Sequence, residues 1–365
     1  MSSFRTAFNF HQPTQVLESG KRYLILAEGK SQDVHYGKTA RGVIRYGPDP
    51  VTAVVDSHAG GGTLDGVPVV ANVSEGLALN PRPNTALVGV AVAGGRLPPE
   101  WRGILRACIE GGLDVESGMH EFLADDPELA ELANTHGVEL RDVRRPPPDL
   151  SVPTGENLRH GAAVVLTVGS DCAIGKKTVA IELDAEARRR GLRSVFVPTG
   201  QTGIMIAGWG IAVDAVVSDF LAGAAERLVV EGASRGDLLW VEGQGALLHP
   251  QFSGVTLGLY HGSAPHLLVL CHMAGESEIE GCPGHAIPPL TELVELHERI
   301  ALPARSARVA AIALNTVRLD DEAARAAIAE AGRETGLPAD DPVRFGAAPL
   351  VDAVLARLPS GIRPA

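Results

Sequence analysis

The chain lacks the features of several large classes of protein. Its 365 residues are 45% hydrophobic. No apolar run reaches the roughly 18 residues that a membrane-spanning helix needs. Its few cysteines are scattered and form no C-x-x-C pair, which argues against a disulfide scaffold and against a zinc site; they are Cys108, Cys172, Cys271 and Cys282. We therefore expect free thiols and no membrane partner.

Positive charge is also scarce. Lys and Arg number 32 against 44 for Asp and Glu, and the resulting net charge of −12 would repel a nucleic-acid backbone. Residues 1–8 contain no basic segment leading into an apolar core, so nothing marks the chain for export. We expect a cytoplasmic enzyme that acts on a small molecule, with no nucleic-acid partner. A homo-oligomer is the common state of such enzymes.

Length and a proline run divide the chain. Domains of about 100–200 residues are usual, so this length predicts two domains. Pro146-Pro147-Pro148 and the polar stretch to Arg159 interrupt regular structure, which places one domain in residues 1–150 and another in residues 151–365. Alternating patterns in the first domain predict strands at 23–27, 51–56, 68–71, 86–92 and 139–143 and helices at 99–109 and 127–135.

The second domain repeats this rhythm around a glycine-rich loop. Its expected strands span 162–168, 194–197, 238–241, 267–270 and 309–314, and its expected helices span 178–190, 219–231 and 320–334. Strands that alternate with helices form a parallel sheet covered on both faces. The predicted fold is therefore α/β, with an N-terminal Rossmann-like domain followed by a P-loop domain built on a doubly wound parallel sheet.

The loop after the first strand of the second domain has the chemistry of a phosphate cradle. Backbone N–H groups and the start of the next helix attract an anion, and Lys176 can reach a phosphate. The predicted phosphate-binding residues are Gly169, Ser170, Asp171, Cys172, Ala173, Ile174, Gly175, Lys176, Lys177 and Thr178.

The spacing of this loop departs from the usual G-x-x-x-x-G-K-[ST]. Its glycines are one residue further apart, and Lys177 stands where the metal-binding hydroxyl is expected. Thr178, one position later, could supply the hydroxyl instead. The departure affects the expected magnesium ligand more than the phosphate cradle.

Further candidates follow the other strand ends, which meet at one edge of a parallel sheet. Glu242 follows the strand at 238–241, where a carboxylate can hold magnesium or accept a proton. The same set of loops carries Gln201, Thr202, Gln244, His249 and His272. The two histidines could line a site or be ordinary hydrogen-bonded residues.

Two candidates have a second interpretation. Lys38 of the first domain suits a substrate carboxylate across an interdomain cleft, or it lies in a basic surface turn. Cys172 at a helix N-terminus would have a lowered pKa, which permits a covalent acyl intermediate, or it is a small residue that fills a tight loop.

Two resemblances rest on these motifs. The P-loop, Val197-Pro-Thr-Gly200 and Val241-Glu242-Gly243 resemble the dethiobiotin-synthetase branch of P-loop proteins, and Asn315 and Pro349 are similar to its adenine pocket. Over nearly its whole length the chain resembles a family, long filed as a domain of unknown function, that includes bacterial N-acetyltransferases of D-amino acids. The matching stretches are 36–40, 118–123, the P-loop with Cys172, 199–204, 218–223, and 242–245 through His249-Pro250.

The family resemblance implies acetyl transfer from acetyl-CoA to the amine of a small amino acid such as D-glutamate. Glu242 or His249 would deprotonate the attacking ammonium, with Lys176 as a further catalytic residue. The loop, Asn315 and Pro349 would bind the coenzyme, and the substrate would contact Lys38, Gln201, Thr202, Gln244 and His272.

The other resemblance implies an alternative activity. This is an ATP- and magnesium-dependent kinase or carboxylate-activating ligase, with Thr178, Asp171 and Glu242 as metal ligands. A nucleotide-gated regulator without turnover forms a third class. The number of polar groups that converge on one strand edge argues against it.

Overall fold

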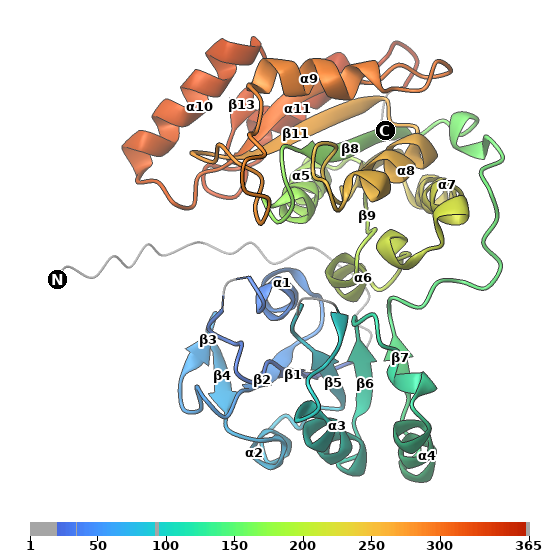
Figure 1. Cartoon of the computed structure of the whole chain (residues 1–365), viewed down its shortest axis with the longest axis vertical. Coiled ribbons are helices and arrows are strands. Elements are labelled where there is room, and N and C mark those ends of the chain that lie inside the picture. The colour runs from blue at the N-terminus through green and yellow to red at the C-terminus, as the bar shows by residue number, and fades with distance from the viewer. Residues whose placement is uncertain (1–19, 34, 92–94, 363–365) are drawn as a thin grey trace.

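The structure is a computed structural model that describes residues 20–33, 35–91 and 95–362. Two sheets with their helices form two units that lie one above the other in Figure 1. The predicted α/β class is confirmed. Residues 1–8, on which the expectation about export rests, lie outside the described residues. Within the described ranges, no helix has both the length and the apolar character needed to cross a membrane.

The N-terminal sheet has the strand order β3-β4-β2-β1-β5-β6-β7, and only the β3–β4 pair is antiparallel in the described part. Its strands are β1 (Tyr23–Leu26), β2 (Val51–Val55), β3 (Thr63–Leu64), β4 (Val67–Val70), β5 (Thr85–Val88), β6 (Asp114–Ser117) and β7 (Leu140–Asp142). The central strand β1 is buried throughout, as expected for an apolar run covered on both faces. The strand expected at 86–92 is shorter, and residue 92 lies outside the described residues.

Four α-helices are described in this unit, namely α1 (Lys38–Tyr46), α2 (Val73–Leu77), α3 (Trp101–Glu110) and α4 (Pro127–His136). The expected helices at 99–109 and 127–135 correspond to α3 and α4. Lys38 is the first residue of α1, directly after a turn at residues 35–37, and it is exposed. The helix forms because Ala40 and Val43 bury one face of it against the sheet.

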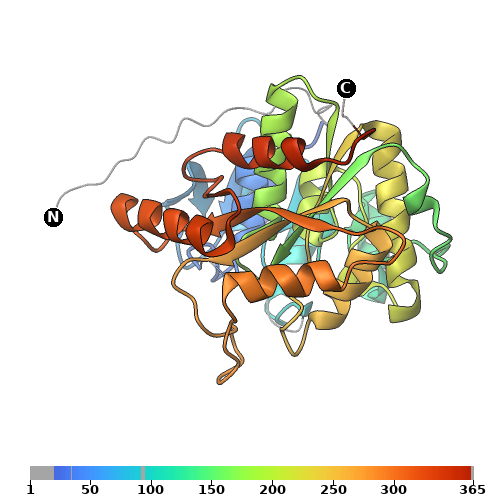
Figure 2. The same cartoon turned by 90° about the horizontal axis from the view of Figure 1, so that it is seen from above.

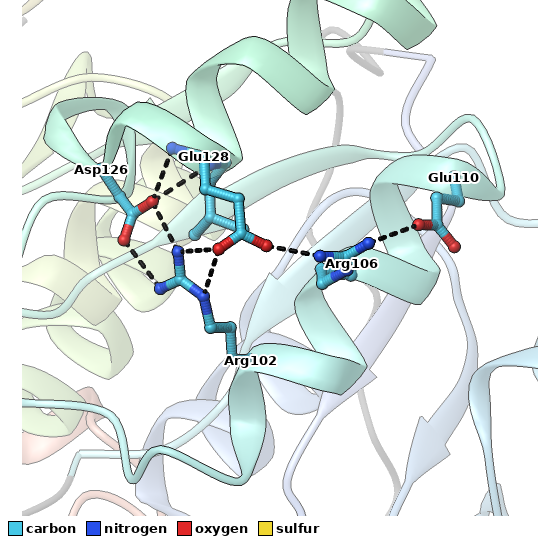
Figure 3. Close-up of polar contacts among 6 residues, drawn as sticks. Arg102, Arg106, Glu110, Asp126 and Glu128 are labelled. Carbon is cyan, nitrogen blue, oxygen red and sulfur yellow. Dashed lines mark hydrogen bonds and ion pairs between the residues drawn. The ribbon is translucent and has the colours of Figure 1, made fainter.

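Charged side chains join α3 to α4 (Figure 3). Arg102 donates to both oxygens of Asp126 at 2.7 and 2.8 Å and to Glu128 at 2.7 Å. Arg106 bridges Glu128 at 2.5 Å and Glu110 at 3.5 Å. Asp126 also caps α4, because its Oδ1 accepts from the backbone N–H groups of Glu128 and Leu129.

The C-terminal sheet is parallel, in the order β13-β12-β11-β8-β10-β9. Its strands are β8 (Ala163–Gly169), β9 (Ser194–Val197), β10 (Leu238–Val241), β11 (Leu267–Met273), β12 (Arg308–Asn315) and β13 (Ala339–Asp340). Its helices are α5 (Lys176–Arg189), α6 (Gln201–Ala207), α7 (Ser218–Arg235), α8 (Ser253–Ser263), α9 (Leu290–Arg299), α10 (Asp321–Thr335) and α11 (Ala348–Arg357). Short 3₁₀ helices η2 (Leu123–Asp125), η3 (Glu156–Leu158) and η4 (Val213–Ala215) lie in connecting segments.

Helices cover both faces of the C-terminal sheet, as Figure 2 shows. Ala163 and Val165 of β8 face the core under α5 and α11. The alternating residues Val164 and Leu166 face the core under α7, α8 and α9. This period of two explains the continuous apolar sequence of β8, since both of its faces are buried.

Helix α6 joins the two units, although the sequence places it in the second. Its residues Met205 and Ile206 belong to the hydrophobic core of the N-terminal sheet, and Figure 1 shows α6 beside α1. The hydroxyls of Thr39 in α1 and Thr202 in α6 share a hydrogen bond of 2.9 Å. The N-terminal sheet is thus partly covered by a helix that begins at the edge of the C-terminal sheet.

Candidate functional site

The P-loop connects β8 to α5 and is closed by its own lysine. Lys176 is buried, and its Nζ donates to the backbone oxygen of Asp171 at 2.5 Å. Burial lowers the pKa of Lys176. Since a phosphate oxygen is a stronger acceptor than a backbone carbonyl, an anion in the loop would compete for this ammonium.

Neighbouring strands brace the loop. Asn315 at the end of β12 donates from Nδ2 to the backbone oxygen of Ile174 at 3.1 Å. In β11, Nδ1 of His272 lies 2.9 Å from the hydroxyl of the buried Ser170. These two predicted ligand-binding residues therefore contact the loop directly. Pro349 lies farther along, exposed in the first turn of α11.

Glu242 directly follows β10 and is 4% exposed. Its Oε2 accepts from the backbone N–H groups of Thr199 at 2.9 Å and Gly200 at 3.1 Å, whereas Oε1 makes no hydrogen bond with the described residues. Burial raises the pKa of Glu242 to about 7, although the charge of Lys177 opposes the rise. The carboxylate is therefore rigidly held, with one oxygen free and a pKa suited to a general base.

Two ammonium groups face the same region without a partner. Neither Lys38 nor Lys177 makes a hydrogen bond or an ion pair with the residues that the structure describes. Desolvation lowers the pKa of both, that of Lys177 to about 8. The pKa of Lys38 responds to Cys172 of the P-loop and to Glu280, so the end of this side chain lies near the loop although the residue as a whole is exposed. Unpaired cations beside a phosphate cradle indicate an anionic ligand.

The start of α6 contributes polar groups on the side of the N-terminal unit. Gln201 is 7% exposed, and its Oε1 has no hydrogen-bond partner. It packs against Gly118, where an added Cβ would lie 1.8 Å from Oε1. Gln244 donates from Nε2 to the hydroxyl of Thr199 at 3.3 Å, which places it beside Glu242. A buried amide without a partner is costly unless a ligand completes it.

His249 lies in the loop after β10 and is 3% exposed. Its Nδ1 accepts a hydrogen bond of 3.2 Å from the backbone N–H of Gln251, so the neutral ring carries its proton on Nε2. The Nε2 atom lies 4.0 Å from Oδ1 of Asp171 and has no closer acceptor among the described residues. His249 is therefore arranged as a hydrogen-bond donor, and Glu242 is the better placed base.

The side chains of Asp171, Cys172 and His249 lie within 4.8 Å of one another, close enough to hold a metal ion. Burial raises the pKa of Cys172 to about 11, so the lowered pKa expected for this thiol is wrong. Metal binding would also require His249 to give up its bond with Gln251. These three side chains are thus poorly arranged to bind a cation. The protonated thiol also argues against a covalent acyl intermediate.

The predicted magnesium ligands Thr178, Asp171 and Glu242 stay a prediction. The two oxygens of Asp171 accept from the backbone N–H groups of Cys172 at 2.6 Å and Glu280 at 2.7 Å. In the described part of the chain, no group of three close ligand atoms contains Glu242. The carboxylates are thus held by N–H donors rather than turned toward a common ion.

Some residues around this site were not predicted from the sequence. Arg144, after β7, donates to the backbone oxygen of Gly118 at 2.5 Å and forms an ion pair with Asp214. Gly42 of α1 approaches so closely that an added Cβ would lie 2.9 Å from Cγ2 of Thr202 and 3.1 Å from Nζ of Lys177. The position of Arg144 just after a strand is the sequence feature that could have identified it. Gly42 carried no signal, because only the packing of two units requires it.

Comparisons with known proteins agree with this architecture. Residues 54–146 match the DUF1611_N Rossmann-like domain and residues 151–351 match the DUF1611_C P-loop domain, both described as domains of unknown function. A crystal structure of a DUF1611 family protein from Anabaena variabilis has 40% sequence identity and a TM-score of 0.87, over 92% of this chain and 99% of that chain.

Two curated relatives carry the name D-glutamate N-acetyltransferase. The protein from Tritonibacter scottomollicae is 37% identical over 91% of this chain and 98% of its own length. The protein from a Pseudoalteromonas species is 35% identical over 75% of this chain and 81% of its own length. The chain therefore belongs to the DUF1611 family, as its motifs indicated, and is an enzyme of the N-acetyltransferase class.

Proposed function

We propose that this enzyme transfers an acetyl group from acetyl-CoA to the amine of D-glutamate or a closely similar acidic amino acid. The donor and the acceptor are inferred from the names of the two curated relatives and from the chemistry of the site. The observation that carries the proposal is Glu242, a buried carboxylate with a pKa of about 7 and one free oxygen beside the P-loop.

The acceptor must first lose a proton, because an ammonium has no lone pair with which to attack. Oε1 of Glu242 accepts that proton, and the neutral amine adds to the thioester carbonyl of acetyl-CoA. The tetrahedral intermediate then expels coenzyme A as a thiolate, which takes up the second proton that the nitrogen loses, and the amide remains. Above pH 7 Glu242 is ionised and ready to act as the base.

Other residues bind and polarise the reactants in this proposal. The P-loop holds phosphates of the coenzyme, and the unpaired Lys38 attracts a carboxylate of the amino acid. The Nε2–H group of His249 donates to the developing oxyanion, for which a fixed donor in a buried site is well suited. Gln201 offers its unpartnered amide oxygen to the ammonium of the amino acid.

The alternative of an ATP-dependent kinase or ligase remains a prediction, and no contact in the site favours it. It requires magnesium at Thr178, Asp171 and Glu242, whose carboxylates accept backbone N–H groups instead. The two activities differ in an easily measured way. Only the alternative consumes ATP.

The test is an assay of purified protein with acetyl-CoA and D-glutamate, in which free thiol and the mass of the product are followed. We expect N-acetylglutamate and coenzyme A in equal amounts, and a loss of at least about a hundredfold in rate for Glu242→Gln, as is usual when a general base is removed. L-glutamate and D-alanine serve as acceptor controls. Absence of acetylated product, with ATP consumed when magnesium is present, would refute the proposal.

A further inference from the structure

Lys177 occupies the position at which P-loop proteins hold their magnesium ion. In the usual motif the residue after the P-loop lysine is Ser or Thr, and its hydroxyl coordinates Mg²⁺ beside the phosphates. Here that residue is Lys177, the second residue of α5. A lysine has three donors and no acceptor, so it cannot be a magnesium ligand while protonated.

Thr178 cannot simply take over the role. Successive residues of an α-helix point about 100° apart around its axis, and Thr178 follows Lys177 within α5. Magnesium needs near-ideal octahedral geometry with short oxygen contacts, so a hydroxyl turned this far away does not replace the usual ligand.

The ammonium of Lys177 lies between the P-loop helix and the first domain. Its Nζ would be 3.1 Å from a Cβ added to Gly42 of α1, so it extends toward the interface between the two units. The charge of Glu242 acts on it, yet the two groups form no ion pair within the described residues. A lysine and a carboxylate therefore stand where other P-loop proteins place a metal and its acidic ligand.

We propose that Lys177 replaces the magnesium ion, so that the loop binds its phosphate-bearing ligand without a divalent cation. The ammonium is a fixed positive charge that offsets the phosphate charge, and it also repels a metal ion from the same place. The inference rests on the proposed function for the identity of the ligand, since coenzyme A is a phosphate compound of this kind. The phosphate chemistry itself can be tested with a simpler probe.

The first experiment is calorimetric titration of the purified wild-type protein with acetyl-CoA and, separately, with ADP as a diphosphate probe. Each titration is done with EDTA and again with magnesium chloride. We expect the dissociation constant of each bound ligand to agree between the two conditions within a factor of about two. A gain of about tenfold or more on adding magnesium would overturn the proposal, as would failure of both ligands to bind under either condition.

Matched variants of one residue test the mechanism. Lys177→Met removes the charge, and Lys177→Thr removes it while restoring the usual hydroxyl. In EDTA both should bind ADP about 10 to 100 times more weakly, as expected for loss of a charged contact. Magnesium should recover the affinity of Lys177→Thr and leave that of Lys177→Met unchanged. Lys177→Arg, which keeps the charge, should bind in EDTA nearly as well as the wild type.

Circular dichroism of each variant establishes whether it is folded. If a variant does not fold, the titrations of the wild-type protein decide the question alone. Folded variants that bind in EDTA as tightly as the wild type would contradict the role of Lys177. Binding of ADP without magnesium, combined with no binding of acetyl-CoA, would support this inference while the proposed function fails. The two ideas are therefore tested separately.

Discussion

At the scale of single residues, Glu242 combines its proposed catalytic role with a cost in stability. Its pKa in the folded protein is about 7, above the ordinary value of 4.5, so the folded state binds a proton more tightly than the unfolded state. The free energy of unfolding must then fall as the pH rises from about 4.5 to 7, and the penalty is complete above pH 7.

Glu242→Gln should therefore be more stable than the wild type at pH 8, by up to about 3 kcal/mol, since one pKa unit corresponds to about 1.4 kcal/mol. At pH 4 the two proteins should be equally stable. The glutamine oxygen can still accept the N–H groups of Thr199 and Gly200. Urea denaturation at the two pH values measures this, and a variant less stable than the wild type at pH 8 would contradict it.

The acid side of the rate profile offers a separate prediction. Because Glu242 must be ionised to accept a proton, kcat/KM should fall about tenfold per pH unit below pH 7. In Glu242→Gln the change of slope near pH 7 should disappear, because the small remaining rate then follows only the fraction of neutral acceptor amine. The profile is measured between pH 5 and 9 with saturating acetyl-CoA. A change of slope near pH 7 that persists in the variant would assign the base to another group.

The donor role of His249 can be tested by substitution with Gln and with Asn, whose amide nitrogens occupy the places of different ring nitrogens. The amide nitrogen of glutamine reaches the place of Nε2, whereas that of asparagine reaches the place of Nδ1. Since the structure makes Nε2–H the free donor, His249→Gln should keep about tenfold more of kcat than His249→Asn. Nitrogen-15 spectra of the wild type should show the proton on Nε2. A proton on Nδ1 would contradict the donor role.

The sequence predicted which residues gather at the site better than what each of them does. Glu242 and His249 were found because both follow a strand end of a parallel sheet, a local signal. The pKa of Glu242 depends on burial, and the tautomer of His249 on one backbone N–H group. Neither can be read from residue types. For Cys172 the helix position indicated a low pKa, and burial reversed it.

At the scale of elements, variants of Asp126 distinguish the stabilising effect of a helix cap from that of the ion pairs between α3 and α4. Asp126 caps α4 and also binds Arg102. Asp126→Ala loses both and should cost about 1 to 2 kcal/mol, whereas Asp126→Asn keeps the cap and should cost under about 1 kcal/mol. Chemical denaturation at pH 7 compares them. Equal losses in the two variants would show that the ion pair, not the cap, stabilises α4.

The pH dependence of this contact has the opposite sign to that of Glu242. The Arg102 hydrogen bonds lower the pKa of Asp126 to about 2, below its ordinary value. Its contribution to stability is therefore present above about pH 4 and is lost as the pH falls toward 2. The difference in stability between the wild type and Asp126→Asn should shrink over that interval.

Strands and helices with a clear hydrophobic periodicity were predicted well. Short elements in which polar and apolar residues are mixed were not. Strand β8 and helix α10 have clear apolar periods and match the expected ranges closely. Helix α1 was missed, because Gly42 and three basic residues obscure the apolar face of Ala40, Val43 and Ile44. Helix α6 is only seven residues long, which is too short for a period to show.

At the scale of the whole molecule, the site depends on both units. The sequence indicated two α/β domains and an interdomain cleft with Lys38 beside it, but nothing in it indicated that Met205 and Ile206 of α6 complete the core of the other unit. Such packing depends on contacts between distant parts of the chain. With α6 fixed on the N-terminal sheet, Thr202 meets Thr39, and Lys38 and Lys177 come to one region.

The most direct test of this account is a crystal structure of the protein with coenzyme A and D-glutamate bound. We predict phosphates of the coenzyme in the loop at 169–178, a carboxylate of the amino acid beside Lys38, and its amine within hydrogen-bond reach of Oε1 of Glu242. A coenzyme bound away from the loop, or an amine far from Glu242, would contradict the account.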